Sequence, residues 1–181
     1  MSAGLYVSVD VETSGPIVGR HSMLAIGACV TSDLERRFYR ILKPISSEAE
    51  PAAMEIVGRP LSHFQEHGVE PRVVCEELRD WLARESGSNY PVFVGFNAAF
   101  DWGFVNWYLL TYLGLNPFGI APLDIKSYFA GLTGVDWDRT RSSNIPDQYK
   151  PISQHTHDPL EDAIEQAAMF ECMRAEPRPQ Q

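Results

Sequence analysis

The segment that most constrains the fold of this chain is the stretch LYVSVDVETSG, which begins at residue 5. Apolar and polar residues alternate along it, and side chains two positions apart on a β-strand point to the same side of the sheet. Its three valines therefore share one face, which predicts a buried core. The opposite face is expected to carry Tyr6, Ser8, Asp10 and Glu12.

Asp10 and Glu12 place two carboxylates side by side at the end of this predicted strand. Like charges at that spacing repel each other, and a divalent metal ion would offset the repulsion. The alternative is a solvated strand end that precedes a Ser-Gly turn. From these two residues alone, both interpretations stay open.

The rest of the chain changes from a strand-like to a helix-like period near its middle. Strands are expected at residues 5–11, 23–31, 36–43, 92–96 and 121–124, and helices at 51–57, 72–85, 100–113, 125–132 and 159–174. This order predicts an α/β fold with one mixed five-stranded sheet flanked by helices. Its first three strands are expected to form an antiparallel meander.

The composition indicates one globular domain, expected over residues 1–176, with a flexible tail at 177–181. No apolar run approaches the roughly 18 residues that crossing a bilayer requires, so no membrane association is expected. The net charge of −9 disfavours coating of duplex nucleic acid, which is itself a polyanion. An enzyme that grips only a strand end needs few phosphate contacts, so nucleic-acid chemistry stays compatible with this charge.

The three cysteines, Cys29, Cys75 and Cys172, are far apart and odd in number. This pattern is neither a disulfide framework nor a zinc-ligand spacing. The N-terminus also lacks the basic region of a signal peptide. The simplest interpretation is a reducing, cytoplasmic setting.

The stretch HTHDPLEDAIEQA near the C-terminus holds two histidines and four acids. Pro159 suits the first helical position, which makes Asp158 the N-cap and Glu161 part of a start that resembles a capping box. Capping leaves Asp162 unexplained, and its place beside the apolar stripe of the helix directs it toward the sheet. Glu165 falls on the polar side and needs no special role.

His155 and His157 precede the predicted helix, where a ring can swing toward a site that a helix interior would exclude. Position alone does not decide whether either histidine is catalytic, or which of the two it would be. A zinc site built on both is a weak alternative, because no cysteine pair lies nearby. Asp101 follows a strand and the segment NAAF, and taken alone it is more simply a structural residue near a helix start.

Taken together, the segments DVET, FNAAFD and HDPLED resemble the three motifs of the DEDD exonuclease superfamily. The histidine five residues before the last aspartate is similar to the DEDDh branch, which includes proofreading exonucleases, oligoribonuclease and ribonuclease T. The resemblance extends over residues 5–172 and implies a ribonuclease H-like fold. It also implies a metal-dependent 3′–5′ exonuclease that releases nucleoside 5′-monophosphates from single-stranded DNA or RNA, or from short oligonucleotides.

The resemblance assigns chemical roles to five residues. Asp10 and Glu12 match the first motif. Asp101 matches the second motif and Asp162 the last acid, and the four carboxylates would bind two Mg²⁺ or Mn²⁺ ions. His157 matches the motif histidine and would be the general base on the attacking water. The resemblance is also compatible with a homodimer, for which the sequence itself carries no feature.

Substrate contacts are expected from residues in or beside the first two motifs. The backbone N–H groups of Thr13 and Ser14 could meet the terminal 3′-hydroxyl and phosphate. Asn97 and Phe100 belong to the second motif. Phe96 departs from the family, since a histidine often stands at that position, and this change could alter the nucleotide pocket.

Three apolar residues are further substrate candidates. Met23 and Leu24 match a position that wedges the terminal base in the family, although both suit the sheet core equally well. Trp102 is the aromatic residue expected to stack on a base, whereas Phe104 and Tyr108, four residues apart, are expected in the core.

Two alternatives stay open. Residues 134–156 are expected to form a long surface loop, either an ordinary solvated one or a flap over the site. The chain could also be a nucleic-acid-binding domain that keeps the exonuclease fold without turnover. The sequence does not distinguish DNA from RNA.

Overall fold

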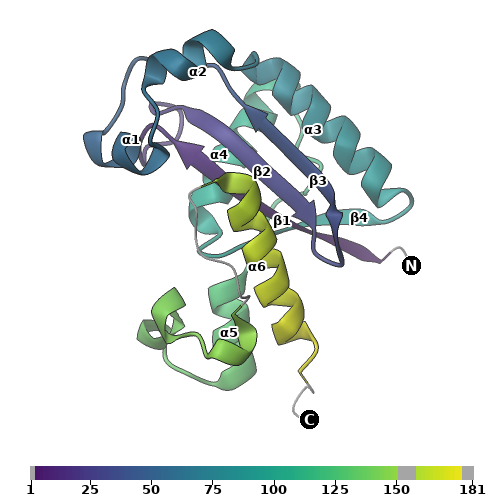
Figure 1. The fold of residues 1–181 in the computed structure, drawn as a ribbon. Helices are drawn as coiled ribbons and strands as arrows, with labels where there is room; N and C mark the ends of the chain where they lie inside the picture. Colours follow the sequence, from purple (N-terminus) through teal and green to yellow (C-terminus); the bar gives the residue numbers. More distant parts are fainter. Residues whose placement is uncertain (1–2, 151–157, 177–181) are drawn as a thin grey trace.

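The central sheet is mixed. A computed structural model describes residues 3–150 and 158–176 of the chain (Figure 1). In this part of the chain, one sheet of five strands has the order β3-β2-β1-β4-β5. The strands are β1 (Gly4–Thr13), β2 (Met23–Val30), β3 (Asp33–Ile41), β4 (Tyr90–Gly95) and β5 (Leu123–Asp124). The first three strands pair antiparallel, whereas β1 pairs with β4 and β4 with β5 in parallel, which confirms the predicted meander and mixed sheet.

Helices cover both faces of this sheet. The described α-helices are α1 (Pro51–Val57), α2 (Leu61–His67), α3 (Pro71–Ser86), α4 (Ala99–Leu113), α5 (Ile125–Thr133) and α6 (Pro159–Arg174). Figure 1 shows α3 and α4 behind the sheet and α6 across its front. Each helix expected from the sequence is present within two residues of its predicted ends. The predicted tail at 177–181 lies outside the described residues.

Two local elements differ from the prediction. Helix α2 was not expected, because its seven residues bury only Phe64 and its N-cap, Pro60, makes no side-chain cap bond. The described part of the predicted 134–156 loop, residues 134–150, contains short 3₁₀ helices at Trp137–Thr140, Ser142–Asn144 and Asp147–Tyr149. Ile145 and Tyr149 are buried against α5 and α6, so this segment packs onto the domain.

The alternation along β1 divides the interior into two clusters. Val7, Val9 and Val11 are buried in the larger cluster, which lies between the sheet and helices α3 and α4. Tyr6 packs on the opposite side, against the cluster that α5 and α6 form. The predicted valine face is therefore core, and Asp10 and Glu12 point toward the side that α6 covers.

Close backbone packing sets the position of α6. Gly27 of β2 pairs with Asp10 of β1. A Cβ added at Gly27 would lie 2.2 Å from the carbonyl carbon and oxygen of Pro159, the first residue of α6. Only a glycine therefore lets the helix start this close to the sheet. As a result, α6 begins directly beside Asp10.

The structure also bears on the cysteines and on the length of the helices. Cys29 and Cys75 are buried, Cys172 is exposed, and all three are free thiols, so no disulfide framework exists. Among the residues that the structure describes, no helix combines the length and the apolar character that a bilayer crossing demands.

Candidate active site

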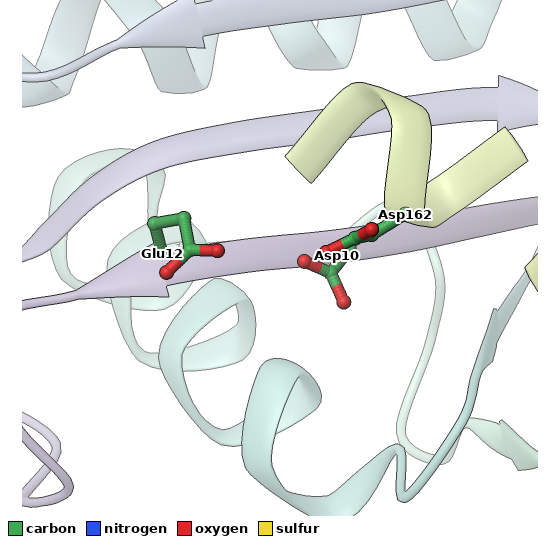
Figure 2. A group of neighbouring side chains, drawn as sticks. All are labelled: Asp10, Glu12 and Asp162. Carbon is green, nitrogen blue, oxygen red and sulfur yellow. The ribbon is translucent and has the colours of Figure 1, made fainter. Parts of the chain in front are cut away.

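Three acids from two elements meet at the carboxyl-terminal end of β1. Asp10, Glu12 and Asp162 each offer a carboxylate oxygen, and these oxygens lie within 4.8 Å of one another. Figure 2 shows Asp162 of α6 next to Asp10, with Glu12 further along β1. The first and third motifs, about 150 residues apart, thus meet in one cluster.

The start of α6 delivers Asp162 to this cluster. Asp158 is the N-cap, and its Oδ1 accepts the backbone N–H groups of Leu160 and Glu161 at 2.9 and 3.3 Å. Pro159 occupies the first helical turn, as the sequence predicts. Asp162 is 4% exposed, which confirms that it faces the sheet rather than the solvent.

Asp101 lies in the first turn of α4 and is 5% exposed. Its Oδ1 accepts the backbone N–H of Val11 at 3.1 Å, so it lies against the same end of β1. The turn before α4 is held from two sides. The N–H of Phe96 donates to Oε1 of Gln166 at 2.8 Å, and the N–H of Ala98 donates to Oδ1 of Asp124 at 3.0 Å.

Between these two anchors, Asn97 adopts a left-handed conformation with φ of 61°. Asparagine is among the few residues other than glycine that accept this conformation readily. The asparagine of the second motif thus shapes the turn that leads into α4. The N-cap of α4 itself is Ala98, not Asn97.

The acids line a cavity of about 510 Å³. Its walls come from β1, from the turn before α4, from α6 and from the segment after α5. The lining residues are Asp10, Val11, Glu12, Phe96, Asn97, Phe100, Asp101, Ser142, Ser143, Asp162, Glu165, Gln166 and Met169. All four predicted carboxylates are therefore together, and Asn97 and Phe100 are with them.

Burial makes the ionised acids costly in the metal-free protein. It raises the pKa of Asp10 well above its ordinary value, and the charges of Asp101, Asp162 and Glu12 raise it further. A hydrogen bond from Gln166 lowers the pKa of Asp10, because it stabilises the ionised form. Burial likewise raises the pKa of Asp101 to about 7, and the N–H of Val11 offsets part of this effect.

This donor set fits divalent cations. Carboxylate oxygens are the hard ligands that Mg²⁺ and Mn²⁺ prefer. A bound cation would also stabilise the ionised carboxylates that burial and mutual repulsion otherwise disfavour. The chemistry of the residues present thus agrees with a metal site.

A second cavity, of about 460 Å³, adjoins the first. The two share Val11, Glu12 and Phe100, and the second extends between the end of β1 and helix α1. Its lining is mainly apolar and includes Thr13, Gly15, Pro16, Ala52, Ala53 and Ile56. Thr13 is the member of the predicted substrate-contact pair that lines this cavity.

Four other predicted contacts have different surroundings. Met23 and Leu24 are 2% and 0% exposed in β2, which is the core position that the sequence left open. Trp102 packs edge-to-face on Phe93 with ring centroids 5.3 Å apart, and it lines neither cavity. The backbone N–H of Ser14 donates to the carbonyl of Ser22 at 2.8 Å, so this donor already has a partner.

Phe104 and Tyr108 are both fully buried, as predicted for core residues. The hydroxyl of Tyr108 accepts the backbone N–H of Met23 at 2.9 Å, which fixes α4 to β2. His155 and His157 lie outside the described residues.

Two cavity residues were missed in the sequence. Glu165 was expected on the surface, yet it lines the cavity. Gln166 is 6% exposed and hydrogen-bonds to both Asp10 and the turn before α4. The sequence did carry a signal for Gln166, which lies four residues after Asp162. Residues four apart on a helix share one face, and Asp162 was already assigned to the inner face.

The fold and the cavity indicate the class of protein. Asp10, Glu12 and Asp162 could together hold a metal ion, and Asp101 lines the same cavity, an arrangement that fits a metal-dependent hydrolase.

Comparison with known proteins gives the family. No protein-family model matches the sequence. The chain is 48% identical over 167 residues to the 3′-5′ DNA exonuclease Cap18 of Escherichia coli, a match that covers 92% of this chain and 89% of that protein. The chain therefore belongs to the DEDDh 3′–5′ exonuclease family and is a 3′–5′ exonuclease.

Solved structures confirm the ribonuclease H-like fold. The nuclease domain of 3′hExo, a DEDDh family member bound to rAMP, superposes with a TM-score of 0.71 at 14% identity, covering 93% of this chain and 91% of that chain. E. coli Exonuclease I in complex with a dT13 oligonucleotide superposes with a TM-score of 0.68 at 14% identity, covering 97% of this chain and 41% of that chain.

Proposed function

We propose that this exonuclease removes nucleotides from the 3′ end of single-stranded DNA and releases nucleoside 5′-monophosphates, with two divalent cations as cofactors. The observation that carries the proposal is the meeting of Asp10, Glu12 and Asp162 in one cavity with the buried Asp101. DNA is favoured over RNA because the curated relative with 48% identity is a DNA exonuclease.

The four acids are proposed to hold Mg²⁺ or Mn²⁺ from three directions: β1, α4 and α6. When bound, two such ions supply electrostatic stabilisation of the charge that develops on the phosphodiester oxygens during hydrolysis. Hydrogen bonds within the protein orient two of these carboxylates before a metal ion binds. The N–H of Val11 orients the Asp101 carboxylate, and the amide of Gln166 orients that of Asp10.

His157 is proposed as the general base that takes a proton from the attacking water. Its ordinary pKa of about 6.5 suits that exchange near neutral pH. In the sequence, His157 directly precedes Asp158, the N-cap of the helix that also carries Asp162. The motif spacing and this connection to the site support the role.

The second cavity is proposed to receive the 3′-terminal nucleoside. It is mainly apolar and of about 460 Å³, so it suits a base and sugar better than a phosphate. Phe100 is 37% exposed and lines both cavities, where it can contact the base while the scissile phosphate lies near the acids. Thr13 in this cavity and Asn97 in the cavity of the acids are also proposed to contact the substrate. The structure offers no support for substrate roles of Met23, Leu24 or Trp102.

A product ladder tests this function. A 5′-labelled single-stranded DNA of about 20 nucleotides and an RNA of the same sequence are incubated with Mn²⁺, with Mg²⁺ or with EDTA. We expect progressive shortening of the DNA, slower shortening of the RNA, 5′-monophosphate products and no activity in EDTA. Asp10→Ala should be inactive. Equal shortening by Asp10→Ala, or activity in EDTA, would contradict the metal-dependent mechanism, and faster cleavage of RNA would contradict the substrate assignment.

The predicted cytoplasmic setting and the homodimer stay predictions. Size-exclusion chromatography with light scattering would test the second one.

A further inference from the structure

Gln166 makes two hydrogen bonds that join separate parts of the active site. Its Nε2 donates to Oδ1 of Asp10 at 2.7 Å, and its Oε1 accepts the backbone N–H of Phe96 at 2.8 Å. The side chain is 6% exposed and lines the cavity that holds the acids. Both ends of one buried amide are therefore used at the site.

The chemistry of the two partners fixes the orientation of this amide. A backbone N–H can only donate a hydrogen bond, so it selects the amide oxygen. An ionised carboxylate can only accept, so it selects the amide nitrogen. A flipped amide would set its NH₂ group against the N–H of Phe96 and its oxygen against the carboxylate of Asp10. Both hydrogen bonds would then be lost inside a poorly solvated space. The amide can therefore hold the Asp10 carboxylate in one rotational position.

The same contacts link the three elements that carry the four acids. Gln166 lies one turn after Asp162 on α6, and its nitrogen reaches Asp10 on β1. Its oxygen holds Phe96 at the start of the turn that leads into α4 and Asp101. A buried glutamine amide needs hydrogen-bond partners in any role, and here both partners belong to the active site.

We propose that Gln166 is a positioning residue that presets the Asp10 carboxylate for divalent cations and fixes its location relative to the turn before α4. The proposal rests on the metal-dependent reaction proposed above and concerns the affinity of the site for metal. Partners of this kind, which bind a ligand rather than the metal, typically change metal affinity or activity by about 10- to 100-fold when removed.

The test uses Mn²⁺ binding as a readout that does not require turnover. Gln166→Met keeps the length of the side chain and removes both hydrogen bonds. Gln166→Glu keeps an acceptor for the Phe96 N–H and replaces the donor to Asp10 with a second carboxylate oxygen. Gln65→Met, on the exposed side of α2, is the matched control. Mn²⁺ affinity is measured by calorimetry, and DNA shortening is measured as a function of Mn²⁺ concentration.

For Gln166→Met we expect Mn²⁺ affinity about tenfold or more below that of the parent protein. The Mn²⁺ concentration for half-maximal activity should rise by a similar factor, while the KM for the oligonucleotide changes little. Gln166→Glu should also require more Mn²⁺, and Gln65→Met should behave as the parent does. A purely structural role would instead lower the unfolding temperature without changing the Mn²⁺ requirement.

Parent-like Mn²⁺ affinity in a folded Gln166→Met protein would overturn the proposal. If that variant does not fold, unchanged or tighter Mn²⁺ binding by Gln166→Glu would overturn it equally. These outcomes differ from a failure of the proposed function, which would show as a parent protein that neither binds nor needs Mn²⁺.

Discussion

Replacement of Asp101 by asparagine should stabilise the metal-free protein at pH 8. The asparagine keeps an oxygen that can accept the N–H of Val11, so the substitution removes the charge and leaves the hydrogen bond. Burial raises the pKa of Asp101 from its ordinary value of 3.8 to about 7. Each pH unit of that difference corresponds to about 1.36 kcal/mol, which gives an upper bound of about 4 kcal/mol.

The sign follows from proton binding. The folded state binds the Asp101 proton more tightly than the unfolded state does, because the folded pKa is raised. The unfavourable contribution of the carboxylate is absent below about pH 4, grows as the pH rises toward 7 and is complete above that value. We expect Asp101→Asn to add about 1–3 kcal/mol at pH 8, less than the bound, because the remaining acids still repel one another.

Thermal unfolding in EDTA measures this effect. For a domain of this size, 1 kcal/mol corresponds to about 2–4 °C, so Tm should rise by about 2–12 °C at pH 8 and by much less at pH 4.5. Saturating Mn²⁺ should shrink this difference in Tm, since Mn²⁺ at about 100 times the Kd stabilises the parent protein by about 2.7 kcal/mol and the variant by less. Asp80→Asn, at an exposed position on α3, is the control and should leave Tm unchanged. An Asp101→Asn protein that is no more stable than the parent in EDTA at pH 8 would refute the reasoning.

Three further predictions concern α6 and the residues before it. His157→Ala should lose about 10²- to 10⁴-fold in DNA hydrolysis while it still binds Mn²⁺, and His155→Ala should be mild; the reverse order in a labelled-oligonucleotide assay would assign the base to His155. Asp158→Ala should cost about 1 kcal/mol in urea unfolding, because two backbone N–H groups lose their acceptor, and a neutral result would contradict the capping role. Gly27→Ala should lower both Tm and Mn²⁺ affinity, because the added Cβ would lie 2.2 Å from backbone atoms of Pro159 and the helix must shift; parent-like values in the same two assays would count against it.

Features encoded by local sequence were predictable. The alternation along β1 identified both the valine core and the acid-bearing face, because side-chain direction on a strand depends only on position. The start of α6 was predictable for the same kind of reason. Asp158 caps N–H groups two and three residues away, so the contact is contained within one turn.

Features that depend on distant parts of the chain were not predictable in this way. Gln166 had the correct spacing from Asp162, but its partner Asp10 is 156 residues away, and nothing local indicates that an amide is needed there. Met23 and Leu24 suit a core and a base-contacting wedge equally well by composition. Only the packing of β2 between its neighbours decides that both are buried.

The contact between Gly27 and the start of α6 has a consequence for how the metal site tolerates change elsewhere. Helices that rest on side chains can shift when a core residue is replaced, because the intervening atoms repack. At Gly27 there is no side chain to repack, and the helix start lies directly against the strand opposite Asp10. The spacing between Asp10 and Asp162 is therefore set by direct contact between the backbone of β2 and the backbone at the start of α6. We expect substitutions among the apolar residues between the sheet and helices α3 and α4 to change the stability of the enzyme while leaving the separation of these two carboxylates almost unaltered.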